Sequence, residues 1–164
     1  MGERWGKRVE LFLSTYVNKV DRKGRVSVPA TFRSTLATHR NPNLVIVFPS
    51  FRLRALECTG SDRMEEMQER IESLEQFSEE HENLSQLFAD AHPLTIDGEG
   101  RVILPEKLKE YADIGGEVAF VGLGATFQLW NPAAYQAHSA AVRERSRRQG
   151  ATLPARGGAA RRPS

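Results

Sequence analysis

The fold is decided by a nine-residue stretch, Asp21-Arg22-Lys23-Gly24-Arg25-Val26-Ser27-Val28-Pro29. It recurs 76 residues later as Asp97-Gly98-Glu99-Gly100-Arg101-Val102-Ile103-Leu104-Pro105. Asp, Gly, Arg, Val and Pro occupy the same places in both copies. Five matches in nine positions, with glycine and proline among them, indicate an internal duplication that sets the architecture of the chain.

The residue types of this motif predict its local conformation. Each aspartate opens a polar turn, because its carboxylate can accept backbone N–H bonds. Each glycine stands where a tight connection needs a positive φ or a close backbone approach. The flanking alternation of apolar residues predicts two strands that form a hairpin, and each proline suits the start of a short helix. The predicted structural residues of the turns are Asp21, Gly24, Pro29, Asp97, Gly100 and Pro105.

The duplicated Asp-x-x-Gly-Arg-x-x-x-Pro motif resembles that of the MraZ family, bacterial transcriptional regulators with two SpoVT/AbrB-type domains in one polypeptide. The resemblance runs from about Phe12 to about Val142. It implies an α+β fold in which two hairpin repeats interlock into one swapped-hairpin β-barrel with short flanking helices. It also implies a ring-shaped homo-oligomer that binds direct repeats upstream of the division and cell-wall gene cluster, including its own promoter.

The distribution of charge predicts a face for an anionic partner. Residues 1–57 hold 11 Lys/Arg against 4 Asp/Glu, a net charge of +7. Residues 58–142 hold 5 against 16, a net of −11, and residues 143–164 hold 7 against 1, a net of +6. A basic first half and a basic end therefore flank an acidic centre, although the whole chain has a net charge of only +2.

The candidate DNA-binding residues lie in the two motif turns. Arg22, Lys23 and Arg25 place three cations within four residues, and arginine can bind guanine edges or phosphates in a bidentate manner. The alternative role for Arg25 is an ion pair with the aspartate four residues earlier, but the clustered charge favours contact with DNA. For Arg101 the ion pair is favoured, because Gly98 and Glu99 replace the other two cations. The resemblance implies a DNA-binding role for Arg25, supported by its two cationic neighbours, and with less weight for Arg101.

Composition and periodicity divide the chain into five segments. Apolar residues at three- and four-residue steps predict two acidic helices that break near Ser78, and a strand is expected over residues 52–58. The helix pair has two interpretations that stay open, a contact between subunits or lobes and a solvated face over an internal core. The segments are a basic extension at 1–10, a first repeat at 11–60, an acidic helical region at 61–91, a second repeat at 92–142 and a basic, disordered tail at 143–164.

Catalytic chemistry has no visible support in the sequence. There is no Gly-x-Ser-x-Gly motif, the lone Cys58 has no obvious histidine partner, and the four histidines show no metal-ligand spacing. We therefore expect no catalytic residue, no metal, no cofactor and no small-molecule substrate. The expected partners are double-stranded DNA and further copies of the chain. Two alternatives stay open: a protein-interaction module of the same fold, and an antitoxin-like regulator.

The same residues predict a location in the cell. No apolar run approaches the length of a membrane span, and Met1–Glu10 lacks the apolar stretch of a signal peptide. A single cysteine rules out an intramolecular disulfide, which fits a reducing compartment. We expect a cytoplasmic protein without membrane contact, and the implied DNA binding adds association with the nucleoid.

Overall fold

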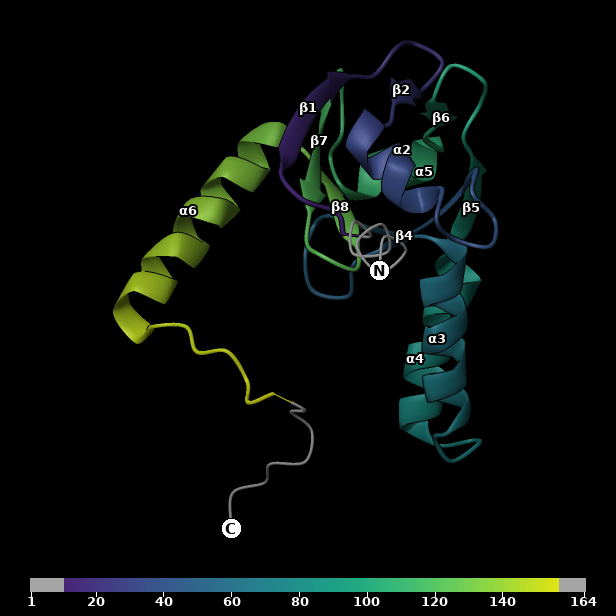
Figure 1. Ribbon diagram of the computed structural model, residues 1–164, viewed down its shortest axis with the longest axis vertical. Helices are drawn as coiled ribbons and strands as arrows, with labels where there is room; N and C mark the ends of the chain where they lie inside the picture. The colour runs from purple at the N-terminus through teal and green to yellow at the C-terminus, as the bar shows by residue number, and fades with distance from the viewer. Residues whose placement is uncertain (1–10, 157–164) are drawn as a thin grey trace, which may run out of the picture. The chain divides into compact units, whose positions relative to one another are not determined.

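The computed structural model describes residues 11–156, so the expected extension at 1–10 and the last eight residues of the expected tail lie outside the described part (Figure 1). The chain separates after Pro132 into two compact units. Its fold is α+β, and every strand pairing is antiparallel. In chain order the elements are β1 (Thr15–Lys19), β2 (Arg25–Ser27), α2 (Ala30–Leu36), β3 (Leu44–Pro49), β4 (Leu56–Thr59), α3 (Ser61–Glu72), α4 (Glu79–Asp90), β5 (His92–Thr95), β6 (Arg101–Ile103), α5 (Glu106–Tyr111), β7 (Glu117–Gly122), β8 (Phe127–Trp130) and α6 (Pro132–Gln149).

The strands on either side of each motif turn do not pair with each other. β1 pairs with β7, and β5 pairs with β3, so each outer strand joins the other repeat. β2 pairs with β6 in a separate two-stranded ribbon. The local hairpin predicted at each motif is therefore wrong. Alternation of apolar residues predicts a strand and its buried face, but it does not identify the partner strand.

The strand order of the main sheet is symmetric between the two repeats. Its six strands run β1-β7-β8-β4-β3-β5. β1, β3 and β4 of the first repeat correspond to β5, β7 and β8 of the second. If each strand is replaced by its counterpart, the result is the same order read from the other end, with every pairing kept. The two repeats therefore occupy equivalent places in one sheet system. Within each repeat only one pair of strands is internal, β3 with β4 or β7 with β8.

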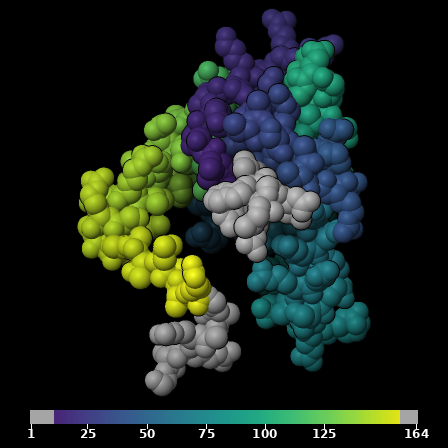
Figure 2. Space-filling view, viewed as in Figure 1, coloured from purple at the N-terminus to yellow at the C-terminus, as the bar shows by residue number. Residues whose placement is uncertain are grey.

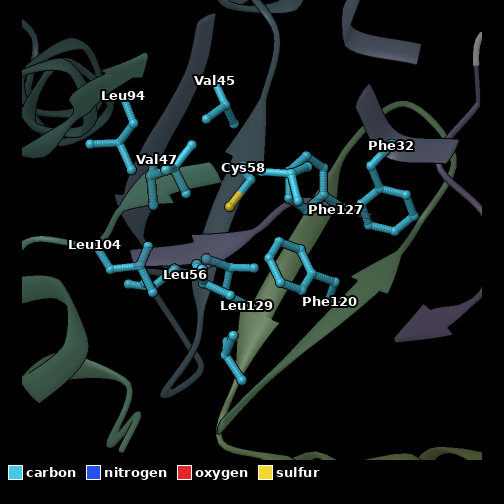
Figure 3. Packing of buried hydrophobic residues seen from close by; sticks show 14 of the residues in the cluster. Phe32, Val45, Val47, Leu56, Cys58, Leu94, Leu104, Phe120, Phe127 and Leu129 are labelled. Carbon is cyan, nitrogen blue, oxygen red and sulfur yellow. The ribbon is translucent and has the colours of Figure 1, made fainter. Parts of the chain in front are cut away.

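The main apolar core of the first unit is shared by both repeats. Its members come from β2, α2, β3 and β4 of the first repeat and from β5, β6, α5, β7 and β8 of the second (Figure 3). Phe32 and Leu36 of α2 are fully buried, as their i, i+4 spacing predicts. Phe32 lies at the centre of an aromatic cluster, with ring centroids 4.9 Å from Phe127 and 5.4 Å from Phe12. A shared core is what two repeats of this size require, because each alone would bury too little surface.

The acidic helices α3 and α4 form an antiparallel pair below the sheet (Figure 1). The break predicted near Ser78 is confirmed: the Ser78 hydroxyl accepts a hydrogen bond from the His81 backbone N–H at the start of α4. Met64 of α3 and Leu87 of α4 pack on Phe48 of β3 in a second, smaller cluster. The apolar faces of the two helices are therefore covered by the chain itself near the sheet. Phe77, in the connection between α3 and α4, is 93% exposed.

Two boundaries differ from the expectation. The strand expected over residues 52–58 begins only at Leu56, and residues 51–55 form bends. Helix α6 extends to Gln149, so the first seven residues of the expected tail, 143–149, are helical. Those residues contain no glycine or proline, and Glu144 lies 3.4 Å from Arg147 and 3.8 Å from Arg148 in helix-spaced ion pairs. Gly150, at φ +75°, then ends the helix as a glycine cap.

Candidate nucleic-acid interface

The first motif loop is held rigid by one aspartate. The Asp21 carboxylate accepts backbone N–H bonds from Lys23 at 2.9 Å and from Arg25 at 2.8 Å. Its second oxygen accepts a bond from Arg25 Nε at 2.6 Å. Gly24 adopts φ +83°, and a Cβ added there would lie 2.9 Å from the Leu104 carbonyl oxygen. The loop therefore needs both the aspartate and the glycine that the motif supplies.

The second motif loop repeats this geometry. The Asp97 carboxylate accepts N–H bonds from Glu99 and Arg101, both at 2.9 Å, and a bond from Arg101 Nε at 3.2 Å. Gly100 adopts φ +79°. The ion pair between each motif arginine and the aspartate four residues earlier is thus present in both loops. The structural role considered for Arg101 holds equally for Arg25.

The two loops meet at one end of the first unit. Leu104 N donates to the Gly24 carbonyl at 2.8 Å, and Val28 N donates to the Gly100 carbonyl at 2.9 Å, so each loop is bonded to the other repeat. Figure 1 shows both loops at the same end, where β2 pairs with β6. In Figure 2 side chains of the first loop, in purple, rise above this end beside the teal surface of the second repeat. Together the loops present one continuous surface built on a short β-ribbon.

The charges on this surface are unequal. Arg22 and Lys23 are exposed, and within residues 11–156 neither pairs with a carboxylate. The Arg25 side chain is 34% exposed despite its ion pair. The first loop therefore presents three cations against Asp21 alone. The structure brings the three first-loop candidates together, as the sequence predicts.

The second loop is close to neutral. Arg101 Nη2 lies 3.5 Å from Glu99 Oε1, so this guanidinium contacts two carboxylates. Sequence reasoning missed a further cation, Arg33 of α2, which lies against Gly100: a Cβ at Gly100 would be 2.5 Å from Arg33 Nη1. Arg33 Nη1 also donates to the Val28 carbonyl at 2.8 Å. In the sequence, only the position of Arg33 on the predicted helix, one turn after Pro29, could have suggested that it lies near a motif loop.

The prolines of the motif end the ribbon strands and precede the helices. Pro29 and Pro105 occupy the position just before α2 and α5, with ψ 140° and 141°, one residue earlier than the first helical place that was expected. Their fixed φ sets the direction in which each helix leaves the ribbon. The helices then place Phe32 and Leu108 in the shared core.

The turn carboxylates have lowered pKa values. The Arg25 backbone N–H is the largest cause that lowers the pKa of Asp21 below its usual 3.8, and the Arg25 side chain adds to it. The Arg101 backbone N–H is the largest cause of the lowered pKa of Asp97. A carboxylate whose pKa is lowered on folding stabilises the folded state above its unfolded pKa, and this stabilisation is lost as the pH falls through the folded value.

We therefore expect the D21N/D97N double variant to show a weaker dependence of Tm on pH below about pH 4 than the wild type. At pH 7 its Tm should be lower, because the amide cannot replace the charge-assisted bonds to the loop. Scanning calorimetry from pH 3 to 7 measures both effects, with Glu110→Gln as a control at an exposed carboxylate of α5. Equal slopes for the double variant and the wild type below pH 4 would show that the turn carboxylates contribute no linked stability.

Other kinds of site find no support in the described part of the chain. Between residues 11 and 156 no three His, Cys, Asp or Glu side chains gather as they would around a metal ion. Over the same residues, none of the helices combines the length and apolar character that crossing a membrane requires.

Comparison with known proteins agrees with the motif. The family model of the MraZ protein, which its description likens to antitoxins, matches residues 87–154. A protein of Gluconacetobacter diazotrophicus named transcriptional regulator MraZ is 42% identical over 152 residues, covering 91% of this chain and 95% of the relative. Its namesake in Gluconobacter oxydans is also 42% identical and covers 93% of this chain and 98% of the relative. The protein of the same name in Pelagibacter ubique is 41% identical and covers 87% of this chain and 92% of the relative.

Proposed function

This chain belongs to the MraZ family of transcriptional regulators, which are not enzymes, and we propose that it binds double-stranded DNA with sequence specificity through its first motif loop. One observation carries this proposal: three cations, Arg22, Lys23 and Arg25, lie together on a rigid loop at the end of a β-ribbon. A two-stranded ribbon fits the major groove of B-DNA, where the base edges are distinguishable.

The three cations suit different parts of the duplex. Arg25 is oriented by the bond from its Nε to Asp21, which leaves its two terminal nitrogens for a bidentate contact with a guanine edge or a phosphate. Arg22 and Lys23 are exposed at the tip and suit phosphate contacts, which position the protein without specifying sequence. The second loop contributes less to affinity, because Arg101 lies beside two carboxylates.

We also propose that the fold is the swapped-hairpin barrel of SpoVT/AbrB-type domains, with both halves in one chain. The pairings of β1 with β7, β5 with β3 and β2 with β6 support this arrangement, because each repeat completes its sheet only with strands of the other. The covalent link then replaces the dimerisation that a single-repeat protein would need.

Family membership suggests how the protein acts in the cell. We propose a ring-shaped homo-oligomer in the cytoplasm, associated with the nucleoid, that binds direct repeats upstream of the division and cell-wall gene cluster and its own promoter. One subunit offers few base contacts, so several linked subunits on spaced repeats gain affinity through their effective concentration. Repeats spaced by about one helical turn would face one side of the duplex.

A second candidate function follows from the description of the matching family as antitoxin-like. In that case the chain would bind a small toxin as well as DNA, and the acidic helices α3 and α4 offer a surface for a basic partner. Affinity purification of the full chain from its native cells after nuclease treatment checks this. A stoichiometric small partner would support the second function, and its absence would leave DNA regulation alone.

The test of the proposed function is fluorescence anisotropy with a duplex from the region upstream of this gene and a scrambled duplex of the same composition. We expect tighter binding to the native duplex. The logarithm of the binding constant should fall linearly with the logarithm of the salt concentration, with a slope that corresponds to several phosphate contacts. Equal affinity for both duplexes at every salt concentration would show non-specific attraction and would contradict the proposal.

A further inference from the structure

The connection between the acidic helices α3 and α4 presents a phenylalanine to solvent. Phe77 is 93% exposed, and Figure 1 shows this connection, residues 73–78, at the end of the helix pair that points away from the sheet. Among the phenylalanines between residues 11 and 156, Phe51 is the only other exposed one, at 61%. A side chain as exposed as Phe77 gains almost no stabilisation from burial within its own chain.

The backbone at Phe77 is also unfavourable for a bulky side chain. Its φ is +68°, in the left-handed region that glycine adopts readily and bulky residues rarely adopt. Ser78 N donates to the Glu75 carbonyl oxygen at 3.1 Å, so Phe77 is the third residue of a turn, where a positive φ calls for glycine. Neither local conformation nor burial within the chain accounts for a phenylalanine here. A contact with another molecule does account for it.

A cleft in the same unit suits an incoming aromatic side chain. It has a volume of about 510 Å³, and no residue of either motif loop lines it. Its apolar walls include Phe48 of β3, Met67 of α3 and Leu87 of α4. The exposed Phe51 also lines this cleft, so a ring that enters it can pack against another aromatic ring.

The charges of the cleft and of the helix connection are opposite. The cleft holds three arginines against one carboxylate: Arg52, Arg63 and Arg70 against Glu57. Arg52 and Arg70 are exposed, and within residues 11–156 neither guanidinium forms an ion pair. The charged side chains at positions 72–80 are all exposed carboxylates: Glu72, Glu75, Glu79 and Glu80. An aromatic side chain among carboxylates therefore complements an apolar cleft among arginines.

We propose that Phe77 of one copy of the chain inserts into this cleft of a second copy, with its flanking glutamates beside Arg52 and Arg70. Arg70 of α3 and Leu84 of α4 line the cleft part-way along the two helices, whereas Phe77 lies at their far end. Two helix pairs that lie side by side in opposite directions place each Phe77 beside the cleft of the other copy. One two-fold axis therefore forms both contacts at once.

This proposal extends the proposed homo-oligomer by naming one contact between its copies, and it needs neither motif loop nor DNA. The first test is analytical ultracentrifugation of the full chain without DNA. Phe77→Gly removes the ring and should lower the mass of the assembled wild type at least twofold at the same concentration. Phe77→Leu keeps an apolar side chain and should retain the wild-type mass. Leu123→Ala, the matched control, removes an apolar side chain that is 54% exposed after β7 and should leave the mass unchanged.

The fold of the single chain should survive Phe77→Gly. At a protein concentration that separates the copies, its Tm should stay close to that of the wild type. The relief of an unfavourable φ offsets the greater freedom that glycine has in the unfolded chain. Circular dichroism at that concentration measures the Tm, so a loss of mass is not mistaken for unfolding.

Charge reversal tests the two surfaces against each other. The variants R52E/R70E and E75R/E79R should each associate at least tenfold more weakly than the wild type, because like charges then face each other across the contact. A one-to-one mixture of the two should restore association, since each helix connection then meets a cleft of opposite charge.

The outcomes separate this contact from the proposed function. A wild type that sediments as a single chain would overturn both the contact and the proposed oligomer. An assembled wild type whose mass Phe77→Gly leaves unchanged, or Leu123→Ala lowers equally, would overturn the contact alone. A mixture of the charge-reversed variants in which no association returns would also overturn it. Equal affinity for native and scrambled duplexes would contradict the DNA proposal but leave this contact standing, because no DNA is present in these measurements.

Discussion

Arg25→Ala is expected to lower the affinity for the native duplex by about 10- to 100-fold, because a bidentate arginine contact with guanine contributes about 1–3 kcal/mol of discrimination. Affinity for the scrambled duplex should fall much less, since Arg22 and Lys23 still contact phosphates. Anisotropy titrations at several salt concentrations measure both effects, and circular dichroism and sedimentation check that the variant is folded and assembled.

Two companion variants separate the contributions of charge and shape. Arg25→Lys keeps the charge but loses the planar guanidinium group. The salt dependence of the binding constant should therefore stay unchanged, while the preference for the native duplex is lost. Glu99→Gln removes one of the two carboxylates beside Arg101, 3.5 Å from its Nη2, and should raise affinity for both duplexes. If Arg25→Ala binds both duplexes as the wild type does, Arg25 serves only to hold the turn through Asp21, and the first loop is not the specific contact.

Phe32→Ala is expected to destabilise the protein by about 3–5 kcal/mol, the range for removing a buried aromatic ring. Its ring is fully buried and packs against Phe12, Tyr16, Phe120 and Phe127. These partners come from both repeats, so the cavity would weaken the contact that joins them. A loss of this size is a large part of the about 5–15 kcal/mol that stabilises a typical domain.

Denaturant unfolding followed by circular dichroism measures this loss. Phe77→Ala removes the same side chain from the connection of α3 and α4, where it is 93% exposed, and should change stability by less than about 0.5 kcal/mol. Equal destabilisation of the two variants would contradict the assignment of Phe32 to the shared core.

The motif loops show how far sequence patterns lead to a candidate site. Asp21 and Gly24 act on their own loop within four residues, so residue type and spacing were enough to predict the turn. Arg33 reaches the second loop from a helix of the first repeat, across 67 positions of sequence, and no local pattern signals that contact.

The sequence by itself determined the duplication, the order of strands and short helices, the break at Ser78 and the cluster of three cations on the first loop. Each of these follows from the conformational preferences of neighbouring residues or from apolar periodicity, which act over a few positions. Only the tertiary structure decided that β1 pairs with β7 and β2 with β6, and that both motif loops lie on one surface. Strand partners depend on contacts between distant residues, because the backbone groups of any strand can bond to those of any other and only packing of the shared core selects among them.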